Sequence, residues 1–278
     1  MNKITFGYEK STSFSKTSTY TNKYYLQSYN TVYRGNENLK NELFHNISLR
    51  YSKYSCYKGI RLYLTARYIK KTEGIVENVE YSGVNQQLSP ILVDDPESRW
   101  TVLGSVKKKI HDINFGVLLS YNNLKYLQQL NTVNQTNKNN TFSYTVNAKT
   151  LIDNFPTIEV GFKQNTGNYT LSEDKTEFIT SEPYFNIDYE FLKGFIFSFD
   201  YSSYTYINKS FNQKNNYKLA NASLFYKKDS SAWSFEIEVQ NVFDVEFKNK
   251  HSFNSYIISD TKTFILPRII MLSIAYNL

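Results

Sequence analysis

The segment "KGIRLYLTARYI", residues 58–69, alternates regularly between two kinds of side chain. Every second residue is apolar: Ile60, Leu62, Leu64, Ala66 and Tyr68. The residues between them are polar or amphipathic: Arg61, Tyr63, Thr65 and Arg67. Because successive side chains of an extended chain point to opposite faces, a period of two predicts a β-strand. This strand would have one apolar face and one polar face.

The same alternation recurs along most of the chain. It is clearest in "FSYTVNAKT" (142–150), "PTIEVGFK" (156–163), "PYFNIDYEF" (183–191), "GFIFSFDYSS" (194–203) and "SAWSFEIEVQNVF" (231–243). We predict about fourteen strands, many of them longer than the five or six residues usual in globular proteins. They lie near 3–10, 42–53, 58–71, 74–82, 98–110, 112–127, 139–150, 155–170, 176–191, 194–209, 214–228, 232–242, 253–264 and 267–278.

The predicted connections alternate between short and long. Short links include "YSCYKG" (54–59), "KKIHD" (108–112), "DNFP" (153–156), "FLKG" (191–194) and "KDSSA" (228–232). Long polar links include "SGVNQQLSPILVDDPES" (82–98), "LNTVNQTNKNN" (130–140) and "TGNYTLSEDK" (166–175). Short turns at one end of a sheet and long loops at the other are typical of outer-membrane β-barrels.

Composition separates a membrane barrel from a soluble double sheet. Aromatic residues make up 17% of the chain although the mean hydropathy is −0.50, and glycine and proline are scarce. Aromatic residues crowd expected strand ends at 20–29, 189–197 and 200–206, as in the girdles at a lipid boundary. Charged residues lie mid-strand, which a water-filled lumen tolerates better than a sandwich core. We therefore predict an all-β, transmembrane, antiparallel up-and-down β-barrel.

Other classes of function have weak support. The single cysteine, Cys56, allows no internal disulfide. The net charge of +7 comes from scattered lysines and arginines, so we expect no nucleic-acid partner. The three histidines, His45, His111 and His251, are far apart, and we expect no cofactor, no metal site and no enzymatic activity. One weaker alternative is a calcium site formed by Asp94, Asp95 and Glu97 at a loop tip.

Two motifs resemble a known family. The segment "GNENLKNE" is followed by His45, Asn46 and Ile47; its residues are Gly35, Asn36, Glu37, Asn38, Leu39, Lys40, Asn41 and Glu42. It resembles the "GNPNLKPE" motif in the outer-membrane β-barrels of TonB-dependent receptors of the Bacteroidetes type. Glu37 and Asn41 replace the two expected prolines, while Gly35 and the asparagines keep turn-forming conformations.

The second motif is at the C-terminal end. "VQNVFDVEF" (239–247) and "LPRIIMLSIAYNL" (266–278) are similar to the closing strand pair of the same family. The final strand alternates through Ile270, Leu272, Ile274, Tyr276 and Leu278. In the family this strand carries the signal for the barrel-assembly machinery and ends in phenylalanine, which is Leu278 here.

The resemblance implies a function and a location. Such receptors import scarce nutrients across the cell outer membrane through a barrel of about 22 strands that is blocked by a plug and energised by the TonB complex. About fourteen strands, with the first motif near the start and the terminal strand at the end, imply that residues 1–278 are the C-terminal part of that barrel. We find no plug, TonB-contacting segment or signal peptide in the sequence. We expect a truncated or split receptor, with outer-membrane lipid and the remaining barrel and plug as partners.

Two other functions remain open. An even number of strands could close into a smaller passive pore. Alternatively, the long loops could bind surfaces, as in an adhesin. In each case the polar face would line the lumen, and the candidates we name there are Arg61, Arg67, Lys149, Glu236 and Glu238.

Overall fold

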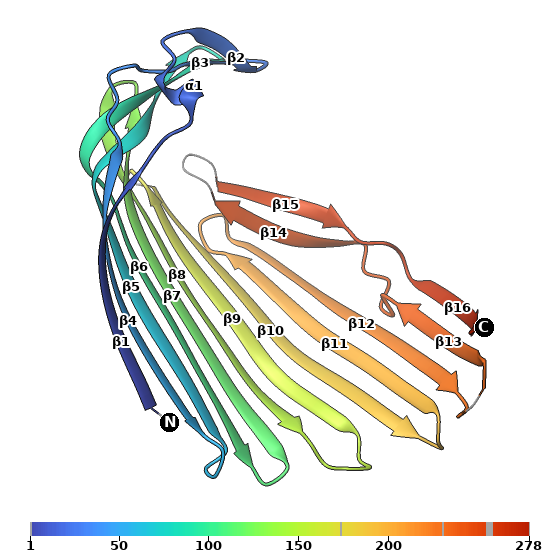
Figure 1. Ribbon diagram of the computed structural model, residues 1–278. Coiled ribbons are helices and arrows are strands. Elements are labelled where there is room, and N and C mark those ends of the chain that lie inside the picture. Colours follow the sequence, from blue (N-terminus) through green and yellow to red (C-terminus); the bar gives the residue numbers. More distant parts are fainter. Residues whose placement is uncertain (1, 173, 230, 254–257, 278) are drawn as a thin grey trace.

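The computed structural model describes residues 2–172, 174–229, 231–253 and 258–277. Most of these residues belong to one long, curved and mainly antiparallel sheet (Figure 1). The sheet contains β1 (Asn2–Ser13), β4 (Glu42–Ser55), β5 (Ile60–Ser82), β6 (Asn85–Ile110), β7 (Ile113–Leu130), β8 (Val133–Thr150), β9 (Thr157–Leu171), β10 (Asp174–Phe191), β11 (Phe195–Asn208), β12 (Gln213–Lys227), β13 (Trp233–Gln240) and β16 (Ile269–Tyr276). The described part is therefore almost wholly β, as expected.

Three small elements accompany this meander. The helical turn α1 (Thr17–Tyr20) and the hairpin of β2 (Tyr24–Ser28) and β3 (Thr31–Arg34) lie at one end of the sheet. A second hairpin, β14 (Phe247–Phe253) with β15 (Ile258–Phe264), is inserted between β13 and β16. Our predicted strand at 253–264 covers part of this hairpin, and its residues 254–257 lie outside the described residues.

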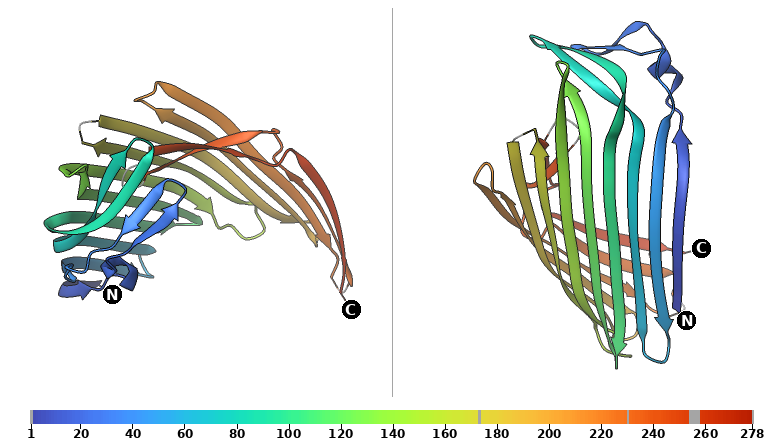
Figure 2. Two further views of the ribbon diagram at one scale, coloured as in Figure 1. Left: turned by 90° about the horizontal axis from the view of Figure 1, so that it is seen from above. Right: turned by 90° about the vertical axis from the view of Figure 1, so that its left-hand side faces the viewer.

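Strand order follows chain order, so the topology is up-and-down. The order runs β1, β4, then β5 to β13, and ends with β16. Seen from above, the sheet forms an arc whose two ends are well apart (Figure 2). In the described part of the chain, β1 pairs only with β4, and β16 only with β13. Within the described residues the sheet is therefore open, and the smaller, self-closed barrel of the alternative prediction is not present.

The predicted long loops proved to be strands. Residues 85–97 belong to β6, residues 133–140 to β8, and residues 166–171 to β9, so these hairpins turn tightly near Gly83, Asn131 and Ser172. All three turn residues have positive φ values, of 64°, 47° and 57°. Likewise, the strands predicted at 58–71 and 74–82 are one strand, β5, with a register shift between Lys71 and Glu73. Apolar residues in these extensions do not alternate regularly with polar ones, as in the run from Pro90 to Val93, so no period of two marks the extensions as strands.

The register places the apolar residues of all strands on a single face. Leu64 of β5 lies opposite Tyr51 of β4 and Gly104 of β6. At the other end, Ile237 of β13 lies opposite Leu224 of β12 and Leu272 of β16. Directly paired residues share a face of a sheet. One apolar face therefore runs without interruption from β1 to β16.

This apolar face is the convex one. On β13, Phe235 and Ile237 are 40% and 49% exposed, whereas Glu236 and Glu238 between them are only partly exposed. On β7, Phe115 and Val117 are 44% and 39% exposed, whereas Asn114 and Gly116 beside them are only partly exposed. Side chains diverge on the outside of a curved sheet and crowd together on the inside. The polar face is therefore concave.

The helical turn α1 and the β2–β3 hairpin form a cap at one end of the sheet, and this cap has a small core of its own. Tyr33 of β3 packs with Val79 and Leu88, and Leu130 lies against them. A short parallel pairing joins β3 to β6 at Thr31 to Tyr33. The aromatic segment 20–29 thus lies in the cap around β2, not at a strand end of the main sheet, so our assignment of it to a lipid-boundary girdle was wrong.

Candidate functional site

The convex face carries an apolar belt with a sharp boundary. Along β8, the outward positions are polar from residue 134 to 140 and apolar from 142 to 148. They are Asn134, Thr136, Lys138 and Asn140, followed by Phe142, Tyr144, Val146 and Ala148. The belt on β5 runs from Ile60 to Tyr68, which is about 26 Å along the strand at 3.3 Å per residue. If the strand is tilted by roughly 40° from the barrel axis, the belt is about 20 Å high along that axis. This height approaches that of the apolar band of outer-membrane barrels.

Aromatic rings border the belt near the short-turn end. Phe191 and Phe195 flank the β10–β11 turn with ring centroids 5.6 Å apart, and Phe195 stacks on Tyr226 at 4.3 Å. Further along the sheet, Trp233 and Tyr276 contact each other at 4.8 Å. The segment 189–197 therefore lies where a girdle was expected.

A second aromatic border lies at the other edge of the belt. Tyr68 and Trp100 are 4.6 Å apart, and the rings of Phe142, Tyr144 and Phe162 follow at about 6 Å intervals, the spacings being 6.0 and 5.9 Å. Tyrosine and tryptophan favour the boundary between lipid and water because their rings are amphipathic. The belt is thus apolar in the middle and aromatic at both edges.

The concave face is linked by polar contacts between neighbouring strands. Lys163 pairs with Glu182 at 3.0 Å, and Glu159 accepts hydrogen bonds from Asn147 at 2.8 Å and from the Tyr184 hydroxyl at 3.1 Å. Asn221 donates to Asp200 at 2.9 Å. These contacts cross-link the sheet on the side that holds its mid-strand charges.

All five lumen candidates from the sequence lie on this concave face. Arg67 donates to Asn46 at 2.8 Å, the Arg61 guanidinium lies 5.3 Å from the Tyr54 ring centroid, and Lys149 is 3.8 Å from Glu159. Glu236 and Glu238 occupy the far end of the face, on β13. The candidates share one face but do not converge on one point.

The "GNENLKNE" motif forms a compact junction between the cap and the sheet. A Cβ atom on Gly35 would lie 2.5–2.7 Å from the carbonyl oxygens of Thr21, Ser18 and Thr19, so only glycine lets α1 approach. Asn36 donates to the Pro90 carbonyl at 3.1 Å and accepts from the Asn38 backbone N–H at 3.0 Å. Leu39 is buried, with 8% exposure.

Glu42, the last motif residue, fixes the start of β4. Its Oε1 accepts from the Ile75 backbone N–H and from Lys71 Nζ, each at 3.0 Å. Lys71 also lies 3.5 Å from Glu97, which pairs with Arg99 at 3.1 Å. The motif therefore holds the point where the chain enters the main sheet.

The C-terminal motif forms a second junction around Asn241. Its amide nitrogen donates to the Val245 and Leu266 carbonyl oxygens, and its oxygen accepts from the Val245 N–H, each at 2.9 Å. Asp244 accepts from the Arg268 backbone N–H at 2.8 Å. These bonds hold together the two points at which the chain leaves β13 and returns to β16.

The predicted assembly strand corresponds to β16. Its outward residues are among the most exposed apolar side chains: Ile270 is 71% exposed, Leu272 68%, Ile274 57% and Tyr276 53%. Leu278 lies outside the described residues. The strand has no partner on its outer edge within the described chain, which explains this high exposure.

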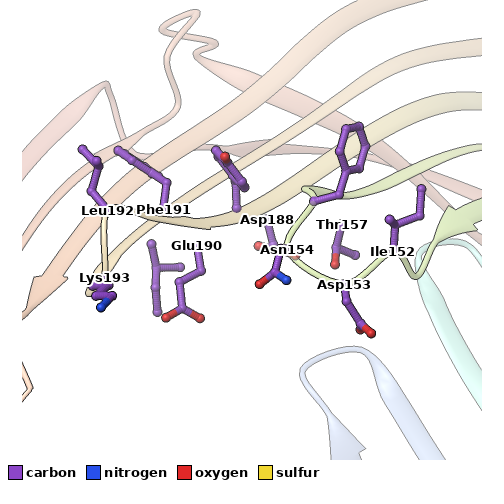
Figure 3. Close-up of a pocket in the computed structure, with 12 residues that line it drawn as sticks. Ile152, Asp153, Asn154, Thr157, Asp188, Glu190, Phe191, Leu192 and Lys193 are labelled. Atoms are coloured by element: carbon purple, nitrogen blue, oxygen red, sulfur yellow. The ribbon is translucent and has the colours of Figure 1, made fainter.

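A pocket of about 640 Å³ lies at the short-turn end, between the β8–β9 and β10–β11 turns (Figure 3). Its lining is mixed: the charged residues are Asp153, Asp188, Glu190 and Lys193. Apolar side chains form much of the rest of the wall, among them Ile152, Phe155, Phe191, Leu192 and Ile196. The pocket is a partly acidic, partly apolar hollow at the short-turn end of the sheet.

The candidate calcium ligands have other partners. Asp95 pairs with Lys70 at 2.9 Å, and Glu97 pairs with Lys71 and Arg99. His45 contacts the Tyr8 hydroxyl at 2.8 Å, His111 lies in a turn, and the side chain of His251 lies outside the described residues. Within the described ranges, no group of three or more histidine, cysteine or acidic side chains could hold a metal ion.

Comparisons with protein families and with curated proteins find no match for this chain. No helix in the described residues has the length and apolar character needed to cross a membrane.

Our list of lumen candidates omitted several residues. Lys107 lies directly opposite Arg61, and Lys109 and Asp200 lie on the same concave face. The alternation of the sequence could have identified these residues, because each stands at a position whose side chain points to the polar face of its strand. Pairing across strands, however, is visible only in the structure.

Proposed function

We propose that this chain is a section of the wall of an outer-membrane β-barrel. The belt carries the proposal: one continuous convex face is apolar in the middle and aromatic at both edges, while the concave face is polar and charged. In a soluble protein such a broad apolar surface would be exposed to water. Facing lipid, it needs no further partner.

We further propose that the barrel belongs to a TonB-dependent receptor for nutrient uptake in the cell outer membrane. The two sequence motifs support this, because each builds a hydrogen-bonded junction at a point where the chain enters or leaves the sheet. The open sheet favours a wall section over a self-contained pore, since a passive pore needs a closed wall. On this proposal, further strands and a plug complete the barrel, and the assembly machinery inserts it.

Site-specific labelling tests the membrane orientation. With Cys56 replaced by serine, single cysteines at Leu64 and Thr65 would carry a fluorophore in protein refolded into phospholipid vesicles. We expect nitroxide-labelled lipid to quench the label at position 64 and aqueous iodide to quench the label at 65. Equal iodide quenching at both positions would contradict a lipid-facing belt.

A second experiment tests the receptor assignment. Native outer membranes would be cross-linked, and the polypeptides joined to this chain identified by mass spectrometry. We expect the chain in the outer-membrane fraction, cross-linked to a plug-bearing polypeptide or continuous with one. If the chain is recovered from the outer-membrane fraction and no plug is found, either cross-linked to it or in the same polypeptide, the result would support a passive pore or an adhesin instead.

A further inference from the structure

The charges on the concave face are separated into two regions. A basic region lies on β4 to β6 and comprises Arg50, Arg61, Arg67, Lys107 and Lys109. An acidic region lies on β10, β11 and β13 and comprises Asp188, Glu190, Asp200, Glu236 and Glu238. These strands occupy opposite sides of the curved sheet (Figures 1 and 2). The concave face is therefore polarised across its width.

Neither region is neutralised by its neighbours. Within the described residues, none of these ten side chains takes part in an ion pair. The pairs Lys149–Glu159 and Lys163–Glu182 lie between the regions, where their charges cancel. Lys3 and Glu9 offset each other on β1, and Lys227 offsets one acid at the lower edge of the acidic region. The basic region therefore keeps an excess of positive charge, and the acidic region an excess of negative charge.

The basic region contains an unfavourable pair. Arg61 and Lys107 are directly opposite in the β5–β6 register. Like charges in this position destabilise a sheet. Arg61 contacts the Tyr54 ring, and Lys107 takes part in no ion pair within the described residues. An anionic group from a ligand would offset this repulsion.

The distance between the regions sets the size of the ligand. Lys107 on β6 and Asp200 on β11 are five strands apart, about 24 Å along the sheet at 4.8 Å per strand. A single zwitterionic metabolite is too short to reach both regions. An extended peptide covers this distance with seven or eight residues.

We propose that the concave face binds a polypeptide segment whose acidic and basic residues are well separated. Its acidic part lies against β4 to β6 and its basic part against β10 to β13. This inference rests on the proposed function only in that the concave face is a lumen accessible to such a segment. Nucleic acids and anionic lipid headgroups fit less well, because the acidic region repels them.

A labelled peptide can test both binding and orientation. The probe has four aspartates at one end, a Gly-Ser spacer and four lysines at the other end, and the full chain is refolded in detergent micelles. Cys56, which is exposed in the β4–β5 turn beside the basic region, carries an energy-transfer acceptor. We expect a donor on the aspartate end to transfer more energy than a donor on the lysine end. Equal or reversed transfer would overturn the proposal.

Matched variants separate this site from general charge effects. Arg61→Gln with Lys107→Gln should weaken binding of the probe about tenfold. Lys125 and Lys138 are also directly opposite each other, but on the convex face, so replacing both with glutamine is the control and should leave binding unchanged. A peptide with the same residues in alternating order should bind about tenfold more weakly than the probe. Equal effects of the two double variants, or equal binding of the two peptides, would contradict the proposal.

The two proposals fail in different ways. If the chain inserts into vesicles with the expected quenching but the probe shows no preferred orientation, only the binding inference is wrong. If the probe binds in the expected orientation in micelles but position 64 is not lipid-exposed, the membrane proposal is wrong and the polarised site remains.

Discussion

At the scale of single residues, the sequence is most informative where polar and apolar side chains alternate. The alternate residues Ile60, Leu62, Leu64, Ala66 and Tyr68 lie on the apolar face predicted for them. Arg61 and Arg67 lie on the polar face. The roles of Gly35 and Asn241 were not predictable in this way. They depend on atoms brought close by folding, such as the carbonyl oxygens of Thr21 and Leu266.

A pair of neighbouring substitutions tests the two faces. Leu62→Arg places a charge on the apolar belt and should reduce the free energy of folding into lipid by about 2 to 4 kcal/mol near the bilayer midplane. Arg61→Leu changes a residue of the concave face and should have little effect. The measurement is a urea titration of vesicle-inserted protein. Similar losses for both substitutions would refute the assignment of faces.

Asn241→Ala should weaken the C-terminal junction. The substitution removes three side-chain hydrogen bonds from a residue that is 5% exposed, a loss of about 1–3 kcal/mol. We expect faster limited proteolysis between β13 and β16. Asn212→Ala is the control, because Asn212 has a similar φ of 49° against 51° but is exposed and makes no side-chain hydrogen bond within the described chain. Equal proteolysis rates in the two variants would argue against the junction.

At the scale of elements, strand positions were predicted well inside the belt and poorly outside it. The long extensions of β5, β6 and β8 beyond the belt are joined by backbone hydrogen bonds between strands, but they lack a regular alternation of apolar and polar residues. The cap hairpin of β2 and β3 was missed because its small core draws on Val79, Leu88 and Leu130, which are distant in sequence.

The cap should loosen at alkaline pH. Burial raises the pKa of the Tyr33 phenol above its ordinary value of 10.0, and the charges of Tyr25 and Glu77 add to the rise. The neutral phenol is therefore favoured in the folded cap, so its contribution is complete below pH 10 and is lost as the pH rises through the folded-state pKa. Hydrogen exchange in β2 and β3 should accelerate above pH 10.

Two tyrosine variants separate the effect of Tyr33 from that of other groups that titrate at high pH. Lysines also titrate in this range, so the wild type is compared with Tyr33→Phe, which should lose the Tyr33-dependent part of the acceleration. Tyr29→Phe alters a residue that is 99% exposed and should behave as the wild type. If Tyr33→Phe and the wild type accelerate alike, the phenol is not responsible.

At the scale of the whole molecule, the decisive feature is an open sheet whose edge strands, β1 and β16, each have a single partner strand within the described residues. In an edge strand of an antiparallel sheet, every second N–H points away from its partner. Amide exchange measured in micelles should therefore alternate between fast and slow along β1 and β16, and be uniformly slow in the belt portions of β7 and β8. Uniform protection of β1 and β16 would show that the two edges are paired, either with each other or with another copy.

The sequence by itself determined the strands of the belt and which residues share each face, because a period of two is a local property of an extended chain. It also pointed to the two junction motifs through their resemblance to known receptors. The tertiary structure alone decided that the sheet is open, that the expected long loops continue as strands, and that basic and acidic residues occupy opposite sides of the concave face. These features depend on which strands pair and in what register, and pairing is set by contacts between residues far apart in the chain.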